Sequence, residues 1–124
     1  MNRILVIEDE NDLKEALRIR LEREGFKVYF AESAEKGLEI ARETKPDLVI
    51  MDVVLPGAMD GVEATYRMKH DEILKDTPVV ILTVKASEED KLRGFKDGAD
   101  AYMSKPFDHE ELITTIKSFL EGER

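Results

Sequence analysis

The segment KPDLVIMD, residues 45–52, decides the fold of this chain. Pro46 stops the helical pattern before it, and the apolar, β-branched run that follows predicts a short strand over residues 47–51. Asp52 comes directly after that run. The segment therefore predicts a strand that ends in a carboxylate.

Four similar runs occur elsewhere, and stretches with the helical period separate them. They predict strands over residues 3–7, 27–30, 79–82 and 101–103. Strands that alternate with helices through short connections form a parallel sheet covered on both faces, with right-handed crossovers. We therefore expect an α/β fold in which a βα unit repeats five times.

Polar residues mark the ends of the expected helices. Gly25 is placed to end the first helix, and Ser33 to cap the second. Three later helix starts carry a capping residue followed three positions on by an acidic residue: Asp60 and Glu63, Ser87 and Asp90, and Asp108 and Glu111.

Length, charge and cysteine content exclude several classes of protein. With 124 residues the chain suits one compact domain, residues 1–124. Its net charge of −9 opposes nonspecific binding to nucleic acid or anionic lipid, and the absence of cysteine excludes disulfides and thiolate metal sites. No apolar stretch reaches membrane-spanning length. We expect a cytoplasmic protein.

Polar groups stand at the ends of four predicted strands: Glu8 and Asp9, Asp52, Thr83, and Lys105. In an open parallel sheet the carboxyl ends of all strands face one crevice, so these residues are expected to meet there. Each has an ordinary explanation when taken alone, as a helix start, a turn, a β-former or a loop lysine. Their joint placement favours a functional site.

The chemistry of these groups indicates phosphoryl transfer. Glu8, Asp9 and Asp52 offer the carboxylate oxygens that Mg²⁺ prefers, and a cation between them would keep them ionised. A carboxylate can attack a phosphoryl group and form an aspartyl phosphate. We expect Asp52 to be this nucleophile. Lys105 and the Thr83 hydroxyl would stabilise charge on the transferring group.

Four segments in order carry a family resemblance: VIEDE (residues 6–10), VIMDVVLPGAMDG (49–61), VVILTVKA (79–86) and GADAYMSKPF (98–107). Together they resemble the motifs of the response-regulator receiver domain of two-component signalling, of the kind found in chemotaxis regulators. The resemblance covers essentially the whole chain. It implies a flavodoxin-like, doubly wound (βα)5 fold with a parallel sheet in strand order 2-1-3-4-5.

The resemblance also assigns a role to each matching residue. Asp52 matches the phosphoacceptor, Glu8 and Asp9 match the acidic pair that binds Mg²⁺, and Val54 would contribute its backbone carbonyl to the metal. Thr83 matches the switch hydroxyl, Tyr102 the aromatic that turns inward behind it, and Lys105 the phosphoryl-binding lysine. The peptide bond between Lys105 and Pro106 is expected to be cis.

Three features depart from the family pattern. Glu8 stands where aspartate is commoner, and the turn GAMDG after Pro56 carries one residue more than usual. Val84 stands directly after Thr83, where the family usually has a smaller residue. We predict that Val84, together with apolar Val54, narrows access to the site and slows autodephosphorylation.

The function implied is that of a signalling phosphoacceptor and not of an enzyme in the usual sense. A sensor histidine kinase or a histidine phosphotransfer protein would donate the phosphoryl group. A downstream protein effector would bind the face of the fourth helix, fifth strand and fifth helix, around Lys91, Phe95, Tyr102 and Lys117. No DNA-binding domain follows Arg124, so we expect this chain to bind no nucleic acid directly. Thr114 and Thr115, where many DNA-binding regulators carry arginine, favour a monomer or weak dimer.

Other classes remain as alternatives. A receiver fold that serves as an interaction module without phosphorylation would keep the same residues. A small Mg²⁺-dependent phosphatase of the haloacid-dehalogenase kind needs a second acid two residues after the nucleophile, where this chain has Val54. Flavin binding is disfavoured because the first strand runs into carboxylates instead of a glycine-containing phosphate loop.

Overall fold

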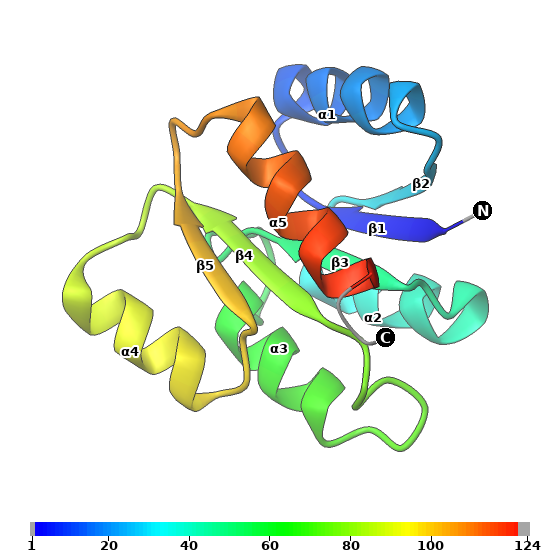
Figure 1. Cartoon of the computed structure of the whole chain (residues 1–124). Helices are drawn as coiled ribbons and strands as arrows, with labels where there is room; N and C mark the ends of the chain where they lie inside the picture. The colour runs from blue at the N-terminus through cyan, green and yellow to red at the C-terminus, as the bar shows by residue number, and fades with distance from the viewer. Residues whose placement is uncertain (1, 122–124) are drawn as a thin grey trace.

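The computed structural model describes residues 2–121, which form a parallel sheet between two layers of helices (Figure 1). The strands are β1 (Arg3–Ile7), β2 (Lys27–Ala31), β3 (Leu48–Met51), β4 (Val79–Thr83) and β5 (Ala101–Ser104). The helices are α1 (Asn11–Arg23), α2 (Ala34–Thr44), α3 (Gly61–Lys69), α4 (Glu88–Lys96) and α5 (His109–Glu121). The sheet order is β2-β1-β3-β4-β5, which confirms the predicted flavodoxin-like topology.

Each predicted strand is present, with its ends moved by at most one residue. β2, β4 and β5 each run one residue further than predicted, because the parallel pairing continues through Ala31, Thr83 and Ser104. β3 begins at Leu48, one residue late. Asp47 still contacts β1: its carboxylate accepts a hydrogen bond from the amide of Arg3 at 2.7 Å, and its own amide donates to the Arg3 carbonyl at 2.7 Å.

The central strands are buried on both faces, which explains their nearly continuous apolar sequence. One set of alternating residues packs under α2 and α3: Leu5, Ile7, Val49, Met51, Val79 and Ile81. The other set packs under α1 and α5: Ile4, Val6, Leu48, Ile50, Val80 and Leu82. Burying each side chain contributes roughly 1.5–3 kcal/mol. Two cores thus hold the central strands, and with them the strand ends, in place.

The predicted helix ends are also confirmed. Ser33 accepts a hydrogen bond from the amide of Lys36 at 3.1 Å, and Gly25 follows α1 with a φ of +95°. Ser87 and Asp90 cap α4 reciprocally, at 3.0 and 3.2 Å. Within residues 2–121, no helix has both the length and the apolar character needed to cross a bilayer.

Candidate functional site

The carboxyl ends of β1, β3 and β5 bring three charged side chains together, as the sequence predicts. The Nζ atom of Lys105 lies 2.8 Å from Oε1 of Glu8 and 2.9 Å from Oδ2 of Asp52. All three side chains are largely buried, with exposed fractions of 14%, 5% and 7% respectively. Residues separated by up to 97 positions therefore form one ion-pair cluster.

Backbone amides fix the other oxygen of each carboxylate. Oε2 of Glu8 accepts a hydrogen bond from the amide of Glu10 at 3.0 Å. Oδ1 of Asp52 accepts one from the amide of Val54 at 3.2 Å. The peptide bond between Lys105 and Pro106 is cis, as predicted. Each of the two carboxylates is thus oriented by the loop that follows its strand.

Burial and ion pairing shift the pKa values of Glu8 and Lys105. Burial raises the pKa of Glu8, and the hydrogen bonds from Lys105 and the Glu10 amide offset this only in part. Burial alone would lower the pKa of Lys105, but its hydrogen bonds to Glu8 and Asp52 outweigh that effect and raise it. Lys105 is therefore an ammonium group at neutral pH, and its single positive charge offsets part of the negative charge of Glu8 and Asp52.

Asp9 completes an acidic group whose chemistry suits a divalent cation. One carboxylate oxygen from each of Glu8, Asp9 and Asp52 lies within 4.8 Å of the others. Glu8 and Asp52 are buried whereas Asp9 is exposed, so the group opens to solvent on one side. Hard oxygen donors with room for retained waters are the ligands that Mg²⁺ prefers. The residues present therefore fit a magnesium site.

Thr83 and Tyr102 meet at the backbone of Lys85. The Thr83 hydroxyl is fully buried and accepts a hydrogen bond from the Lys85 amide at 3.3 Å. The Tyr102 hydroxyl donates to the Lys85 carbonyl at 2.5 Å. Burial raises the pKa of Tyr102, so its hydroxyl stays protonated and able to donate at neutral pH. These contacts join the end of β4 to β5 through the loop before α4.

Sequence reasoning missed the part that Gly61 plays beside Asp52. Its amide donates to the carbonyl of Val53 at 3.0 Å, and a Cβ atom built at this position would lie 1.9 Å from the carbonyl oxygen of Asp52. The start of α3 therefore touches the backbone of the expected phosphoacceptor. The available signal was a glycine, a poor helix former, at the first position of a helix.

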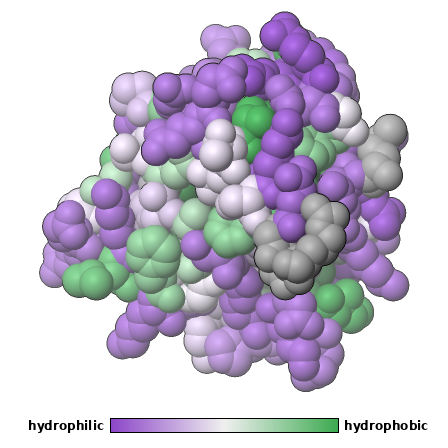
Figure 2. Space-filling model, viewed as in Figure 1, coloured by the Kyte–Doolittle hydropathy of each residue, from purple (hydrophilic) through white to green (hydrophobic). Residues whose placement is uncertain are grey.

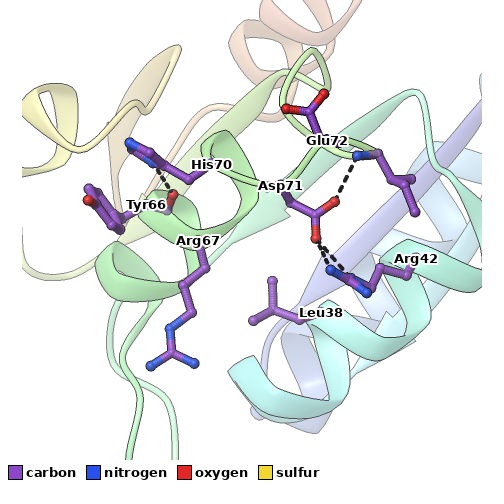
Figure 3. A pocket seen from close by; sticks show the side chains of 8 residues that line it. Leu38, Arg42, Tyr66, Arg67, His70, Asp71 and Glu72 are labelled. Carbon is purple, nitrogen blue, oxygen red and sulfur yellow. Dashed lines mark hydrogen bonds and ion pairs between the residues drawn. The ribbon is translucent and has the colours of Figure 1, made fainter.

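One groove lies away from the acidic cluster. It measures about 630 Å³ and lies between α2 and the end of α3, with Arg42 paired to Asp71 and Tyr66 stacked on His70 (Figure 3). None of the predicted site residues lines it. The chemistry of the cluster, and not the size of a cavity, therefore identifies the candidate site.

Comparison with known proteins identifies the family. The response regulator receiver domain model matches residues 4–117, and the chain belongs to that family. It is 40% identical to the protein PilH of Pseudomonas aeruginosa over 122 residues, which cover 98% of this chain and 100% of PilH. It is 37% identical to the phosphate regulon regulator PhoB of the same organism over 117 residues, covering 94% of this chain.

A solved receiver domain has the same fold and contains a metal ion. The receiver domain of the sensor histidine kinase PA1611 from P. aeruginosa was solved with a magnesium ion in its active-site cleft. It matches with a TM-score of 0.87 and 25% identity, over 96% of this chain and 97% of that one.

The chain spans about half the length of the PhoB relatives that it matches (51% of the P. aeruginosa protein).

Proposed function

We propose that this receiver domain accepts a phosphoryl group on Asp52 and relays a signal by changing its surface. The observation that supports this most strongly is the shared ion pair of Lys105 with Asp52 and Glu8, beside exposed Asp9. The arrangement offers a nucleophilic carboxylate, a cation for phosphoryl oxygens and a donor set for Mg²⁺ in one place.

The proposed step is an in-line displacement at phosphorus. A carboxylate oxygen of Asp52 attacks the phosphorus of a phosphohistidine on a sensor kinase or phosphotransfer protein. The new O–P bond forms as the N–P bond breaks, and the departing imidazole keeps the electron pair and takes up a proton. Lys105 pairs with the phosphoryl oxygens as charge develops on them.

The proposed metal ligands are the carboxylates of Glu8, Asp9 and Asp52 and the backbone carbonyl of Val54. Mg²⁺ bound there would supply positive charge that offsets repulsion between the acids and the incoming phosphoryl group. Glu8 already receives the Glu10 amide and the Lys105 ammonium, which fix its carboxylate in place. Asp9, being exposed, is the ligand with most freedom to adjust.

The proposed output is the face of α4, β5 and α5, around Lys91, Phe95, Tyr102 and Lys117. Figure 2 shows apolar surface over α4, where Leu92 and Phe95 are 69% and 48% exposed. Phosphorylation adds charge and strong acceptor oxygens, which would draw in Thr83 and bias the loop and helix that follow it. Tyr102 contacts that loop at the Lys85 carbonyl. A downstream protein effector would bind the altered face.

The remaining parts of the proposal concern setting and assembly. We place the chain in the cytoplasm, as a monomer or weak dimer that binds no nucleic acid itself. The net charge of −9 supports the last point, because phosphate backbones repel an acidic surface. In this proposal the chain is a phosphoacceptor, and its own chemistry is limited to gaining and losing the phosphoryl group.

Incubation with Mg²⁺ and acetyl phosphate, followed by intact-mass measurement over time, tests the function. We expect the parent chain, and not Asp52→Asn, to gain one phosphoryl group. A folded parent chain that gains nothing would favour an interaction module without phosphorylation. Steady consumption of the donor without accumulation of phosphoprotein would favour a phosphatase.

A further inference from the structure

A single carboxylate links α4 to the loop that follows Asp52. Oδ1 of Asp60 caps α3 by accepting a hydrogen bond from the amide of Glu63 at 2.9 Å. Its other oxygen, Oδ2, pairs with the guanidinium of Arg93 on α4 at 3.0 Å. Asp60 therefore holds the start of α3 with one oxygen and a neighbouring helix with the other.

This link is close to the phosphoacceptor backbone. Gly61, the next residue, donates its amide to the Val53 carbonyl, and its Cα lies against the backbone of Asp52. Burial alone would raise the pKa of Asp60, but the Glu63 amide and Arg93 outweigh it and lower the pKa. Asp60 is thus ionised at neutral pH, and its pairing with Arg93 connects α4 to the phosphoacceptor loop.

Few other contacts fix α4. Within this helix only Gly94 is buried, where it lies against the ring of Tyr102. Leu92 is 69% exposed, and Phe95, although its ring lies 6.1 Å from that of Tyr102, is 48% exposed. An ion pair at the surface is weak in absolute terms, but it can bias the position of a helix that has so few anchors.

We propose that the Asp60–Arg93 ion pair holds α4 in its unphosphorylated position, so that breaking the pair strengthens phosphoryl binding at Asp52. This rests on the proposed function, in which movement of Thr83 and the loop after it displaces α4. Displacement of α4 would separate Arg93 from Asp60 and break their ion pair. Linkage then requires that a contact present only in the unphosphorylated state opposes phosphoryl binding.

Two substitutions separate the ion pair from the helix cap. Asp60→Asn removes the charge and keeps a side-chain oxygen for capping, because asparagine and aspartate cap helices about equally well. Arg93→Gln removes the charge from the other side. Arg67→Gln is the matched control. Arg67 pairs with Glu63 at 3.0 Å, and both side chains are about as exposed as those of the Asp60–Arg93 pair, but both residues belong to α3.

The test is calorimetric titration of the full chain with beryllofluoride, a phosphoryl mimic, in the presence of Mg²⁺. We expect Asp60→Asn and Arg93→Gln each to bind the mimic about two- to fivefold more tightly than the parent chain. The double variant should bind no more tightly than either single one, because all three lack the same contact. The control should match the parent chain. A merely structural role would lower the melting temperature without tightening the binding.

Three outcomes would overturn the proposal, and they distinguish failure of the ion pair's role from failure of the proposed function. If the parent chain binds beryllofluoride and Asp52→Asn does not, but both single variants bind as the parent does, the ion pair has no such role. Additive effects of the two substitutions on binding in the double variant would also show that the ion pair has no such role. If the parent chain itself fails to bind, the proposed function fails, and the inference fails with it.

Discussion

Substituting Gly61 by alanine is a chemically small change, but it should strongly disrupt the loop between Asp52 and the start of α3. The new Cβ atom would lie 1.9 Å from the carbonyl oxygen of Asp52 and 2.9 Å from the side chain of Met51. Ordinary carbon–oxygen contacts are about 3.3 Å, so α3 and the Asp52 backbone must separate by about 1.4 Å. Because the nearest atom belongs to the backbone, no side-chain rotation relieves the overlap.

The expected cost combines two opposing terms. Overpacking of this kind costs about 3 kcal/mol, at the upper end of the usual range, whereas alanine in place of glycine favours a helix by about 1 kcal/mol. We therefore expect Gly61→Ala to lower the free energy of unfolding by about 2 kcal/mol in urea titration. A displacement of about 1 Å at the reacting group should also slow phosphorylation by acetyl phosphate about 100-fold.

Gly94→Ala provides the matched control on another helix. Its Cβ atom would meet two side chains, the ring of Tyr102 at 2.6 Å and Cδ1 of Ile81 at 3.4 Å, and side chains can shift where backbone cannot. We expect a smaller loss of stability and a smaller change in the phosphorylation rate than for Gly61→Ala. If Gly61→Ala keeps both the stability and the phosphorylation rate of the parent chain, the contact between α3 and Asp52 does not position the phosphoacceptor.

Three further outcomes follow from individual side chains. Val84→Ala combined with Val54→Asn should shorten the phosphoryl half-life, measured by intact mass, because we predict that these two exposed valines narrow access to the site. An unchanged half-life would refute this. Lys105→Met should slow phosphorylation by about 100-fold or more through loss of its charge, and a rate within threefold of the parent would contradict that role. The hydrogen bond from the Ile73 amide and the pairing with an arginine lower the pKa of Asp71 below its usual value. Ionised Asp71 therefore stabilises the folded state at pH values above the ordinary carboxyl pKa. This stabilisation is lost as the pH falls through the lower pKa that Asp71 has in the folded state. Asp71→Asn should accordingly be less stable than the parent at pH 7 and equally stable in strong acid, as urea titrations at the two pH values would show.

The sequence predicts the fold well because local and global signals agree. Each strand is an apolar run, and the residues at the strand ends are polar, so parallel topology alone brings Glu8, Asp52 and Lys105 to one edge. Residues such as Ser33 and Ser87 mark helix starts through hydrogen bonds to amides only three positions away. Such local contacts are readable from spacing.

The parts that could not be predicted depend on packing between elements. Asp60 was identifiable as a cap, but its second partner, Arg93, lies 33 positions away on another helix. The closeness of Gly61 to the Asp52 carbonyl depends on the path of the loop between them. No pattern of spacing within one element encodes either contact.

In the proposed function Asp52 carries the phosphoryl group, and chemical trapping can locate that group in the chain. The chain would be phosphorylated with acetyl phosphate and Mg²⁺ and reduced with borohydride, which converts an acyl phosphate to an alcohol; peptide mass spectrometry then locates the altered residue. We predict reduction at Asp52 alone, and none in a sample treated without phosphodonor. Reduction at Glu8, Asp9 or any other carboxylate, with Asp52 unaltered, would contradict the account.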